Sequence, residues 1–293
     1  MYKNFIFLFV TTFFLISCTL MQGGGEGDPG VSLADGQFPV KIEKNQEGFT
    51  GERMPRKARW YRVYWGAITV GDLYVTLIPT AEGYGMRSAI RSKGIAKVVS
   101  NWKSDSGATM RIQEDGKYVP IRFKTSFELR KRTRKIDIHW DKDWKVVKET
   151  NIPPENRHKR PAVPEEQKIG SFDPLTAVMQ GRLLVREAIL SGKREFFVPV
   201  YDGRRKSNIR FKIYGADKNG IIHTSFVEEA VSGYTNNELK EIAKNNPEFH
   251  VYLSPKDLLP VAAKGQSLLG TARIKLKMEC DTLKECQDAG EAS

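Results

Sequence analysis

The sequence predicts a mainly β protein, built from a single curved antiparallel sheet or half-open β-barrel with one packed α-helix. Two observations carry this prediction. Apolar and polar residues alternate along many short segments, and this period of two is typical of strands with one face on a core and the other in water. Only one long segment spaces its apolar residues as a helix does, with clear start and stop signals. Hydrophobic residues make up 40% of the 293 residues, which is enough for a sizeable core.

The strands are predicted where this alternation is bounded by Gly, Pro or Asp. The clearest strand places Phe123 and Phe127 on one face, opposite Lys124 and Glu128. The segments with this pattern are 61–65, 68–70, 73–77, 110–112, 118–120, 121–129, 136–140, 196–201, 209–214, 221–227 and 274–278. Hairpin turns are expected at the Glu-Asp-Gly-Lys and Asp-Gly sequences of residues 114–117 and 202–203.

The long helix is predicted to begin after Asp173, a residue suited to the N-cap, with Pro174 in its first turn. Leucine, valine and methionine recur at helical spacing, with Arg182 among them, and Gly192 ends the helix. We expect this helix to pack across the concave side of the sheet.

Two further segments complete the prediction. A shorter helix is expected over residues 237–244, and residues 151–168, with four prolines and many charges, are expected to form an exposed loop. The alternative to one curved sheet is a division into two domains near residue 160.

The N-terminal segment predicts export. Lys3 precedes an apolar run over residues 5–16, which fits the hydrophobic region of a secretory signal and is short for a bilayer span. The run ends in Leu-Ile-Ser-Cys, which resembles a bacterial lipobox. In such signals the chain is cleaved just before the cysteine, here between Ser17 and Cys18, and the cysteine carries the acyl chains. The alternatives are an ordinary signal peptide, or an uncleaved anchor with an incidental cysteine.

This interpretation divides the chain into a lipoprotein signal peptide (1–17), a flexible Gly-rich tether (18–50), a β-rich domain (51–278) and an acidic tail (279–293). The protein would then be held on a membrane through acyl chains on Cys18. Thr19 stands where inner-membrane retention signals often have Asp, so an outer-membrane location facing the periplasm is expected.

Two cysteines remain near the C-terminus. Cys280 and Cys286 would lie in an oxidising compartment, so a disulfide across five intervening residues is expected there. The alternative is two free thiols in a frayed tail.

Several short motifs, in order along the chain, resemble a family of exported bacterial proteins known as domain of unknown function 3108. They are YRVYWG at 61–66, VG at 70–71, GKYVP at 116–120, DPL at 173–175 and YDGRR at 201–205. The resemblance covers residues 58–278. It implies an exported β-rich domain and supplies no catalytic residue. The expected architecture is similar to the half-open barrels of periplasmic lipoprotein carriers, a likeness at the level of fold alone.

The residues with catalytic or metal-binding chemistry are scattered. The four histidines lack metal-ligand spacing, and neither a His-Glu-x-x-His nor a Cys-x-x-Cys motif occurs. We therefore expect no catalytic residue, no metal and no cofactor. The alternative is an enzyme with an unrecognised site. Its candidate residues are Asp137, His139 and Asp141, which alternate on one face of a strand.

Positive charge is concentrated in one part of the chain. Residues 51–135 hold 19 Lys and Arg against 7 Asp and Glu, while the net charge of the whole chain is +12. The densest group is Arg130, Lys131, Arg132, Arg134 and Lys135. Because export removes nucleic acid as a partner, the expected anionic partners are lipid headgroups, lipopolysaccharide and envelope proteins. The alternative is a solvated hairpin tip without a partner.

The leading functional expectation is a non-enzymatic cell-envelope lipoprotein that holds a lipid or a lipidated partner in the curved sheet. The residues expected to line its groove are Tyr61, Val63, Trp65, Phe123 and Phe127. The alternative is an envelope scaffold that contacts anionic polymers or other envelope proteins through its basic strands. A cavity of several hundred cubic ångströms favours the first expectation, and a sheet packed solid by its own side chains opposes it.

Overall fold

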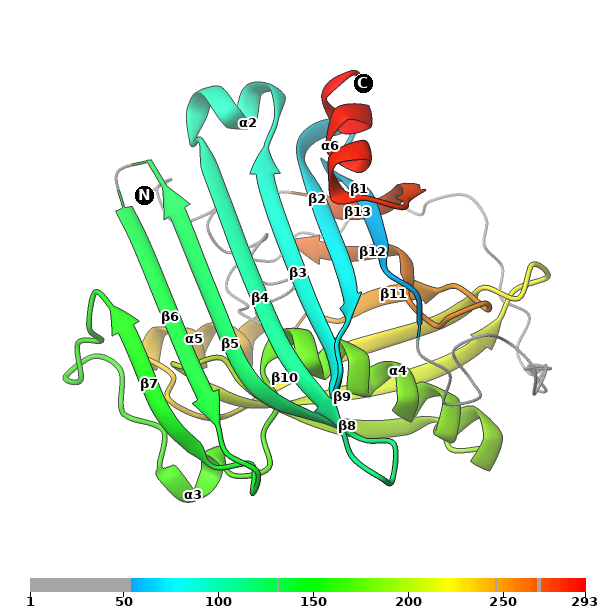
Figure 1. Cartoon of the computed structure of the whole chain (residues 1–293). Helices are drawn as coiled ribbons and strands as arrows, with labels where there is room; N and C mark the ends of the chain where they lie inside the picture. The colour runs from blue at the N-terminus through cyan, green and yellow to red at the C-terminus, as the bar shows by residue number, and fades with distance from the viewer. Residues whose placement is uncertain (1–53, 131, 246, 268–269) are drawn as a thin grey trace.

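In the computed structural model, residues 54–293 are described except 131, 246 and 268–269, and they form one antiparallel sheet of thirteen strands (Figure 1). The strands are β1 (Lys57–Trp65), β2 (Ile68–Pro79), β3 (Gly83–Ser92), β4 (Trp102–Ile112), β5 (Tyr118–Leu129), β6 (Arg132–Trp140), β7 (Val146–Ile152), β8 (Glu195–Tyr201), β9 (Lys206–Ala216), β10 (Ile222–Ser232), β11 (Phe249–Leu253), β12 (Pro260–Ser267) and β13 (Gly270–Cys280). The prediction of a mainly β fold is confirmed.

The strand order explains why the chain is not divided near residue 160. It runs β7-β6-β5-β4-β3-β2-β1-β13-β12-β11-β10-β9-β8, so strands that are consecutive in the sequence lie side by side, except β7 and β8, which are the two edges of the sheet. The pairing of β1 with β13, from Ala58 opposite Cys280 to Trp65 opposite Ala272, joins the first seven strands to the last six. The two-domain alternative is therefore wrong.

The sheet curves without closing, and its two edge strands meet through side chains. Tyr201 donates a hydrogen bond to Glu149 Oε2 at 2.5 Å, and Asn151 Nδ2 donates to the carbonyl of Gly203 at 2.9 Å. Gly203 has φ +88°, and a Cβ there would lie 2.5 Å from Ile136 Cγ2. Glycine therefore lets the β8–β9 turn approach β6.

Five helices lie in the described part of the chain, so the expectation of one packed helix beside a shorter one is not confirmed. They are α2 (Gly94–Val99), α3 (Glu165–Lys168), α4 (Pro174–Ser191), α5 (Asn236–Asn245) and α6 (Leu283–Glu291). α4 and α5 correspond to the two predicted helices. α2 and α3 are too short to show a helical period, and the segment expected as a loop over 151–168 contains α3 and the end of β7. None of the described helices is both long and apolar enough to cross a membrane.

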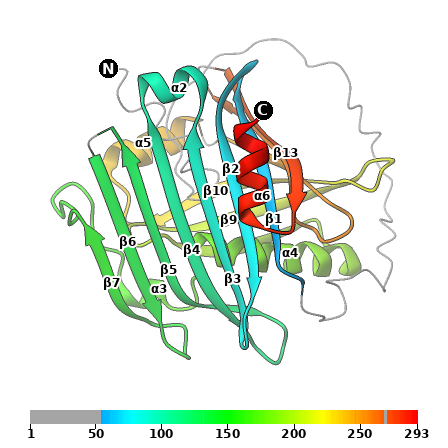
Figure 2. The ribbon, with the colours of Figure 1, turned by 45° about the horizontal axis from the view of Figure 1, so that its top comes forward.

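α4 lies across the concave side of the sheet (Figures 1 and 2). Asp173 caps it by accepting hydrogen bonds from the backbone N–H of Leu175 and Thr176 at 2.9 and 3.0 Å, and Gly192 ends it with φ +71°. Its first half packs Leu175 and Met179 into the core of β1–β6, and its second half packs against β9–β12. One helix therefore supplies core to both parts of the sheet.

The C-terminal tail is part of the fold. A disulfide joins Cys280 to Cys286, both of which are buried. α6 packs on the convex face of β1 and β2, where Trp60 and Tyr74 lie beneath it. Residues 279–293 therefore continue the β-rich domain beyond residue 278, since the end of β13 and α6 bury apolar side chains together.

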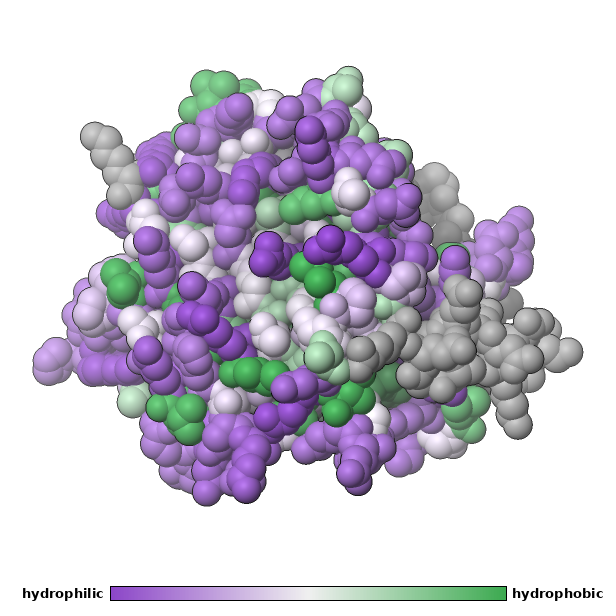
Figure 3. All heavy atoms as spheres, in the orientation of Figure 1, coloured by the Kyte–Doolittle hydropathy of each residue, from purple (hydrophilic) through white to green (hydrophobic). Residues whose placement is uncertain are grey.

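The face of the molecule seen in Figure 3 is mostly hydrophilic. Figure 3 shows apolar residues in small separate groups on the face seen in Figure 1. The group at the top lies over α2, whose Ile95, Val98 and Val99 are exposed. Small groups of this kind are ordinary on soluble surfaces.

Replacement of the α4 cap tests how much the fold depends on this helix. We expect Asp173→Ala to lower the free energy of unfolding by about 1–2 kcal/mol, because two backbone N–H groups lose a buried acceptor. Urea denaturation followed by circular dichroism measures the change. Asp288→Ala, at an exposed position of α6, is the matched control; equal effects of the two substitutions would contradict the central position of α4.

Candidate functional site

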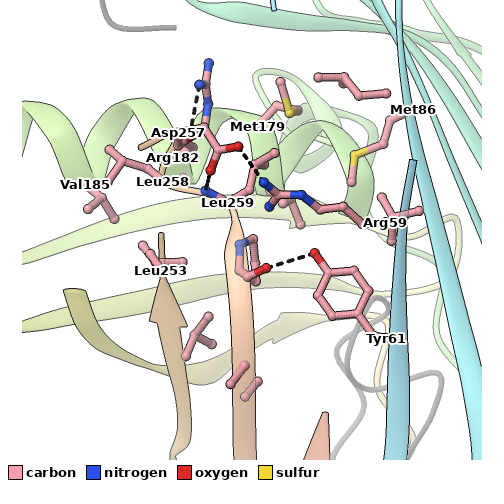
Figure 4. A pocket seen from close by; sticks show the side chains of 18 of the residues that line it. Arg59, Tyr61, Met86, Met179, Arg182, Val185, Leu253, Asp257, Leu258 and Leu259 are labelled. Carbon is pink, nitrogen blue, oxygen red and sulfur yellow. Dashed lines mark hydrogen bonds and ion pairs between the residues drawn. The ribbon is translucent and has the colours of Figure 1, made fainter. Parts of the chain in front are cut away.

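A cavity of about 420 Å³ lies between α4 and the concave face of the sheet. α4 contributes Val178, Met179 and Val185, and strands on both sides of the β1–β13 pairing supply further apolar side chains. The close view in Figure 4 shows Met86 on one side of the cavity and Leu253 on the other. The lining is predominantly hydrophobic, as in small-molecule binding sites.

The cavity exists because small residues face it. Gly181 of α4 and Ala262 and Ala263 of β12 lie in its wall. A Cβ on Gly181 would still be 3.7 Å from the nearest atom of the Phe211 ring, so the helix and sheet are not in tight contact there. The side chains of the protein therefore leave space that larger residues at these positions would fill.

The wall contains five charged residues, and three of them, Arg59, Arg182 and Asp257, are buried, whereas Lys57 is half-buried and Lys256 is exposed. Arg59 on β1 donates to the carboxylate of Asp257 at 2.5 Å, and it also contacts Glu279. Arg182 on α4 donates to the backbone carbonyl of Asp257 at 3.2 Å and to the hydroxyl of Tyr118 at 3.0 Å. Figure 4 shows Asp257 linked by dashed lines to groups on both elements. The two guanidinium groups are thus within reach of the same residue.

The position of Asp257 depends on the loop between β11 and β12. Leu258 has φ +55°, a left-handed conformation that costs a leucine about 1 kcal/mol or more. Its N–H donates to Ser254, and the N–H of Leu259 donates to Asp257 Oδ1 at 3.1 Å. The conformation of this loop places Leu258 in the apolar core and Asp257 against the arginines.

Two hydroxyl groups of the wall form hydrogen bonds within the protein. Tyr61 donates its hydroxyl to the carbonyl of Pro260 at 2.8 Å, and Thr224 donates to the carbonyl of Val251 at 3.0 Å. Burial raises the pKa of Tyr61 to about 12, so its phenol stays protonated at neutral pH.

One of the five residues expected to line a groove lines this cavity. That residue is Tyr61, whereas Val63, Phe123 and Phe127 are buried in the main core. Trp65 is half-buried at the end of β1, outside the cavity wall. The expectation is therefore not met for these four in this cavity. For Phe123 and Phe127 the reason is that the sheet from β4 to β6 is filled by its own side chains and by the β8–β9 turn.

The basic group lies at the β5–β6 hairpin tip. Arg130 occupies the turn with φ +55° and donates to the carbonyl of Val99 at 2.9 Å. Arg134 is paired with Glu155, and Arg132 and Lys135 are exposed. Lys131 lies outside the described residues.

The candidate enzyme residues form an ion pair and a turn. Arg122 donates to both carboxylate oxygens of Asp137, at 3.0 and 2.7 Å, and these hydrogen bonds lower the pKa of Asp137. His139 contacts the same carboxylate at 3.1 Å, and Asp141 accepts backbone N–H groups in the following turn. No group of three or more potential metal ligands occurs in residues 54–293 as far as they are described. Cys18 and the segments 1–17 and 18–50 lie outside the described residues.

Sequence reasoning missed Arg59, Asp257 and the cavity-facing role of Arg182. A signal existed for Arg182, since it is a charged residue among apolar ones at helical spacing. No comparable signal exists for Asp257, because its place depends on a loop that comes back to α4 from a distant part of the chain.

A protein-family model described as "Protein of unknown function (DUF3108)" matches residues 61–277. Among solved structures, a beta-barrel-like protein of domain of unknown function DUF1849 from Brucella abortus is similar, with 13% sequence identity and a TM-score of 0.47. The similarity covers 78% of this chain and 98% of that chain. No curated protein matches.

The buried ion pair can be tested by comparison with an exposed one. We expect Asp257→Asn to lower the free energy of unfolding by about 3 kcal/mol, because Arg59 is 4% exposed and loses its buried carboxylate. Asp105→Asn breaks the pair with Arg91, whose side chains are 43% and 53% exposed, and should change stability by less than about 1 kcal/mol. Guanidinium chloride denaturation measures both; similar small losses would show that Asp257 does not hold the cavity wall.

Proposed function

Since this chain belongs to the family described as protein of unknown function DUF3108, whose description assigns no activity, we propose its function from the cavity and the N-terminal sequence. It is a non-enzymatic, membrane-anchored lipoprotein of the bacterial cell envelope that binds the acyl chain of a lipid or lipidated partner. The cavity between α4 and the sheet is the binding site.

The observation that carries this proposal is the size and lining of the cavity. Its volume of about 420 Å³ lies within the roughly 300–1,000 Å³ of small-molecule sites. An acyl chain gains roughly 0.8 kcal/mol for each methylene that it removes from water. An apolar space of this size beneath a single helix suits such a chain, because it offers continuous apolar contact from both parts of the sheet.

The anchoring part of the proposal is supported by the N-terminal sequence. Lys3, the apolar run over 5–16 and Ser17 before Cys18 are the parts of a lipobox signal. Several acyl chains on Cys18 would give stable attachment. The Gly-rich segment over 18–50 would let the domain stand off the membrane, and Thr19 favours the outer membrane facing the periplasm.

A binding role is also supported by the polar groups in the cavity wall, because Asp257 and Tyr61 are engaged with other groups of the protein. Asp257 is engaged in an ion pair, and Tyr61 donates to a carbonyl with its pKa raised by burial. The scaffold alternative has weaker support, because Arg122, Arg134 and Lys103 in the basic region are paired with carboxylates.

Native mass spectrometry tests the proposal. The chain from residue 18 onward, carrying Cys18→Ser to prevent lipidation, is exported to a bacterial periplasm behind a cleavable signal and purified without detergent. We expect an added mass of a few hundred daltons that denaturation releases and that lipid analysis identifies as containing an acyl chain.

A substitution that fills the cavity should remove this mass. Ala263 lies on β12 with Val251 and Ile274 as its cross-strand partners, all three in the cavity wall. We expect Ala263→Phe to reduce the bound fraction at least severalfold, because the ring would occupy the space of the acyl chain. Ala67→Phe adds the same ring at an exposed turn and should bind as the unsubstituted chain does. A clean apoprotein mass for all three proteins would contradict lipid binding and favour the scaffold alternative.

A further inference from the structure

Arg182 is a buried cation without a carboxylate partner in the described part of the chain. Its side chain is 6% exposed, and it donates to three groups: Met54 Sδ, the carbonyl of Asp257 and the hydroxyl of Tyr118. All three acceptors are neutral. Its Nε has no hydrogen-bond partner among the described residues. An arginine keeps its charge inside a protein, so this side chain brings a positive charge into an apolar wall.

The buried carboxylate in the cavity wall, that of Asp257, is already paired with another arginine. The carboxylate of Asp257 accepts from Arg59 at 2.5 Å and from the N–H of Leu259 at 3.1 Å. Glu279 also pairs with Arg59. The buried part of the site thus places two guanidinium groups beside one buried carboxylate, with Glu279 on the half-exposed side. A buried charge is expensive unless it is paired, so the site lacks an anion.

We propose that the missing anion is the carboxylate of a single-chain fatty acid, bound by Arg182 with its acyl chain in the apolar part of the cavity. This inference rests on the proposed function, because it takes the cavity to be an acyl-chain site, and it adds the chemical class of the ligand. Arg59, which lies in the same wall, brings a second positive charge near the head group.

Two features favour a fatty carboxylate over the other acyl-bearing molecules. The planar guanidinium fork of arginine matches a planar carboxylate through two parallel hydrogen bonds. The volume of about 420 Å³ lies near the lower end of the range for ligand sites, so it suits one chain. A phospholipid or the anchor of a lipidated partner would bring two or more chains and a bulkier head.

The proposal also includes a direction for the acyl chain. In Figure 4 Arg182 and Asp257 lie between Val185 and Leu253 on one side and Met86 on the other. Val251 and Phe226 extend the part with Val185 and Leu253 toward β10 and β11. The acyl chain is assigned to this part, with its carboxylate at the arginines.

Two probes that differ only in head-group charge test this inference. Palmitate and methyl palmitate are titrated separately into the chain from residue 18 onward with Cys18→Ser, after bound lipid has been removed on a hydrophobic resin. Displacement of a fluorescent fatty acid reports both affinities. We expect palmitate to bind at least about tenfold more tightly than methyl palmitate, which corresponds to one charge-assisted hydrogen-bonded contact.

Variants assign the preference to Arg182. Arg182→Gln keeps a hydrogen-bond donor and removes the positive charge. It should bring the affinities for the two probes within about twofold of each other, mainly because palmitate binds more weakly. Arg186→Gln, one helical turn further along α4 and outside the cavity wall, should keep the preference. The circular dichroism spectrum of each variant shows whether it folds. If Arg182→Gln does not fold, the comparison of the two probes on the unsubstituted chain still tests whether the site prefers a carboxylate.

The outcomes separate the two proposals. If both probes bind with equal affinity, the cavity holds acyl chains and the carboxylate assignment is wrong. If neither probe binds, the proposed function itself fails. If palmitate is preferred but Arg182→Gln folds and keeps the preference, the anion is recognised elsewhere and the role of Arg182 is wrong.

Discussion

The structure depends on one helix being packed into the concave side of a single wide sheet. The thirteen strands of the described residues make one curved surface, and α4 contacts both parts of it. Near β4–β6 the remaining space is filled by aromatic side chains and by the approach of the β8–β9 turn, for which Gly203 is required. Beneath the middle of α4, Gly181 and the alanines of β12 leave the space open. The cavity is thus a consequence of the same packing that stabilises the fold.

Charged groups are gathered at one point of this otherwise apolar cavity. Arg59 belongs to β1, Arg182 to α4 and Asp257 to the β11–β12 loop, so three parts of the chain far apart in sequence meet at one point. Buried charges cost free energy, and an apolar replacement of similar shape is often no less stable. The presence of two arginines with a single buried carboxylate therefore argues for a ligand, since packing alone does not require them.

The local pattern of the sequence was a good guide to the fold and a poor one to the site. Alternation predicted most strands, and Asp173, Pro174 and Gly192 marked both ends of α4. Four strands, β3, β7, β11 and β12, were not predicted. In β3 and β12 Gly, Ser and Ala interrupt the alternation, and β2 was divided in the sequence interpretation because Gly71 and Asp72 resemble a turn. In the structure Gly71 instead makes room for Trp102, and Asp72 accepts a hydrogen bond from Trp60.

Phe123 and Phe127 could not be separated from Tyr61 as lining residues, because alternation identifies the concave face without showing where α4 fills it.

The central claim is that one acyl chain lies in this cavity with its carboxylate at Arg182. A crystal structure of the complex with a palmitate brominated at the end of its chain tests it most directly, because anomalous scattering locates the bromine independently of the protein. We expect a bromine site among Val185, Val251, Leu253 and Phe226, and density for the carboxylate at Arg182. A bromine site on the outer surface, or a carboxylate at the cavity mouth with the chain reversed, would contradict it.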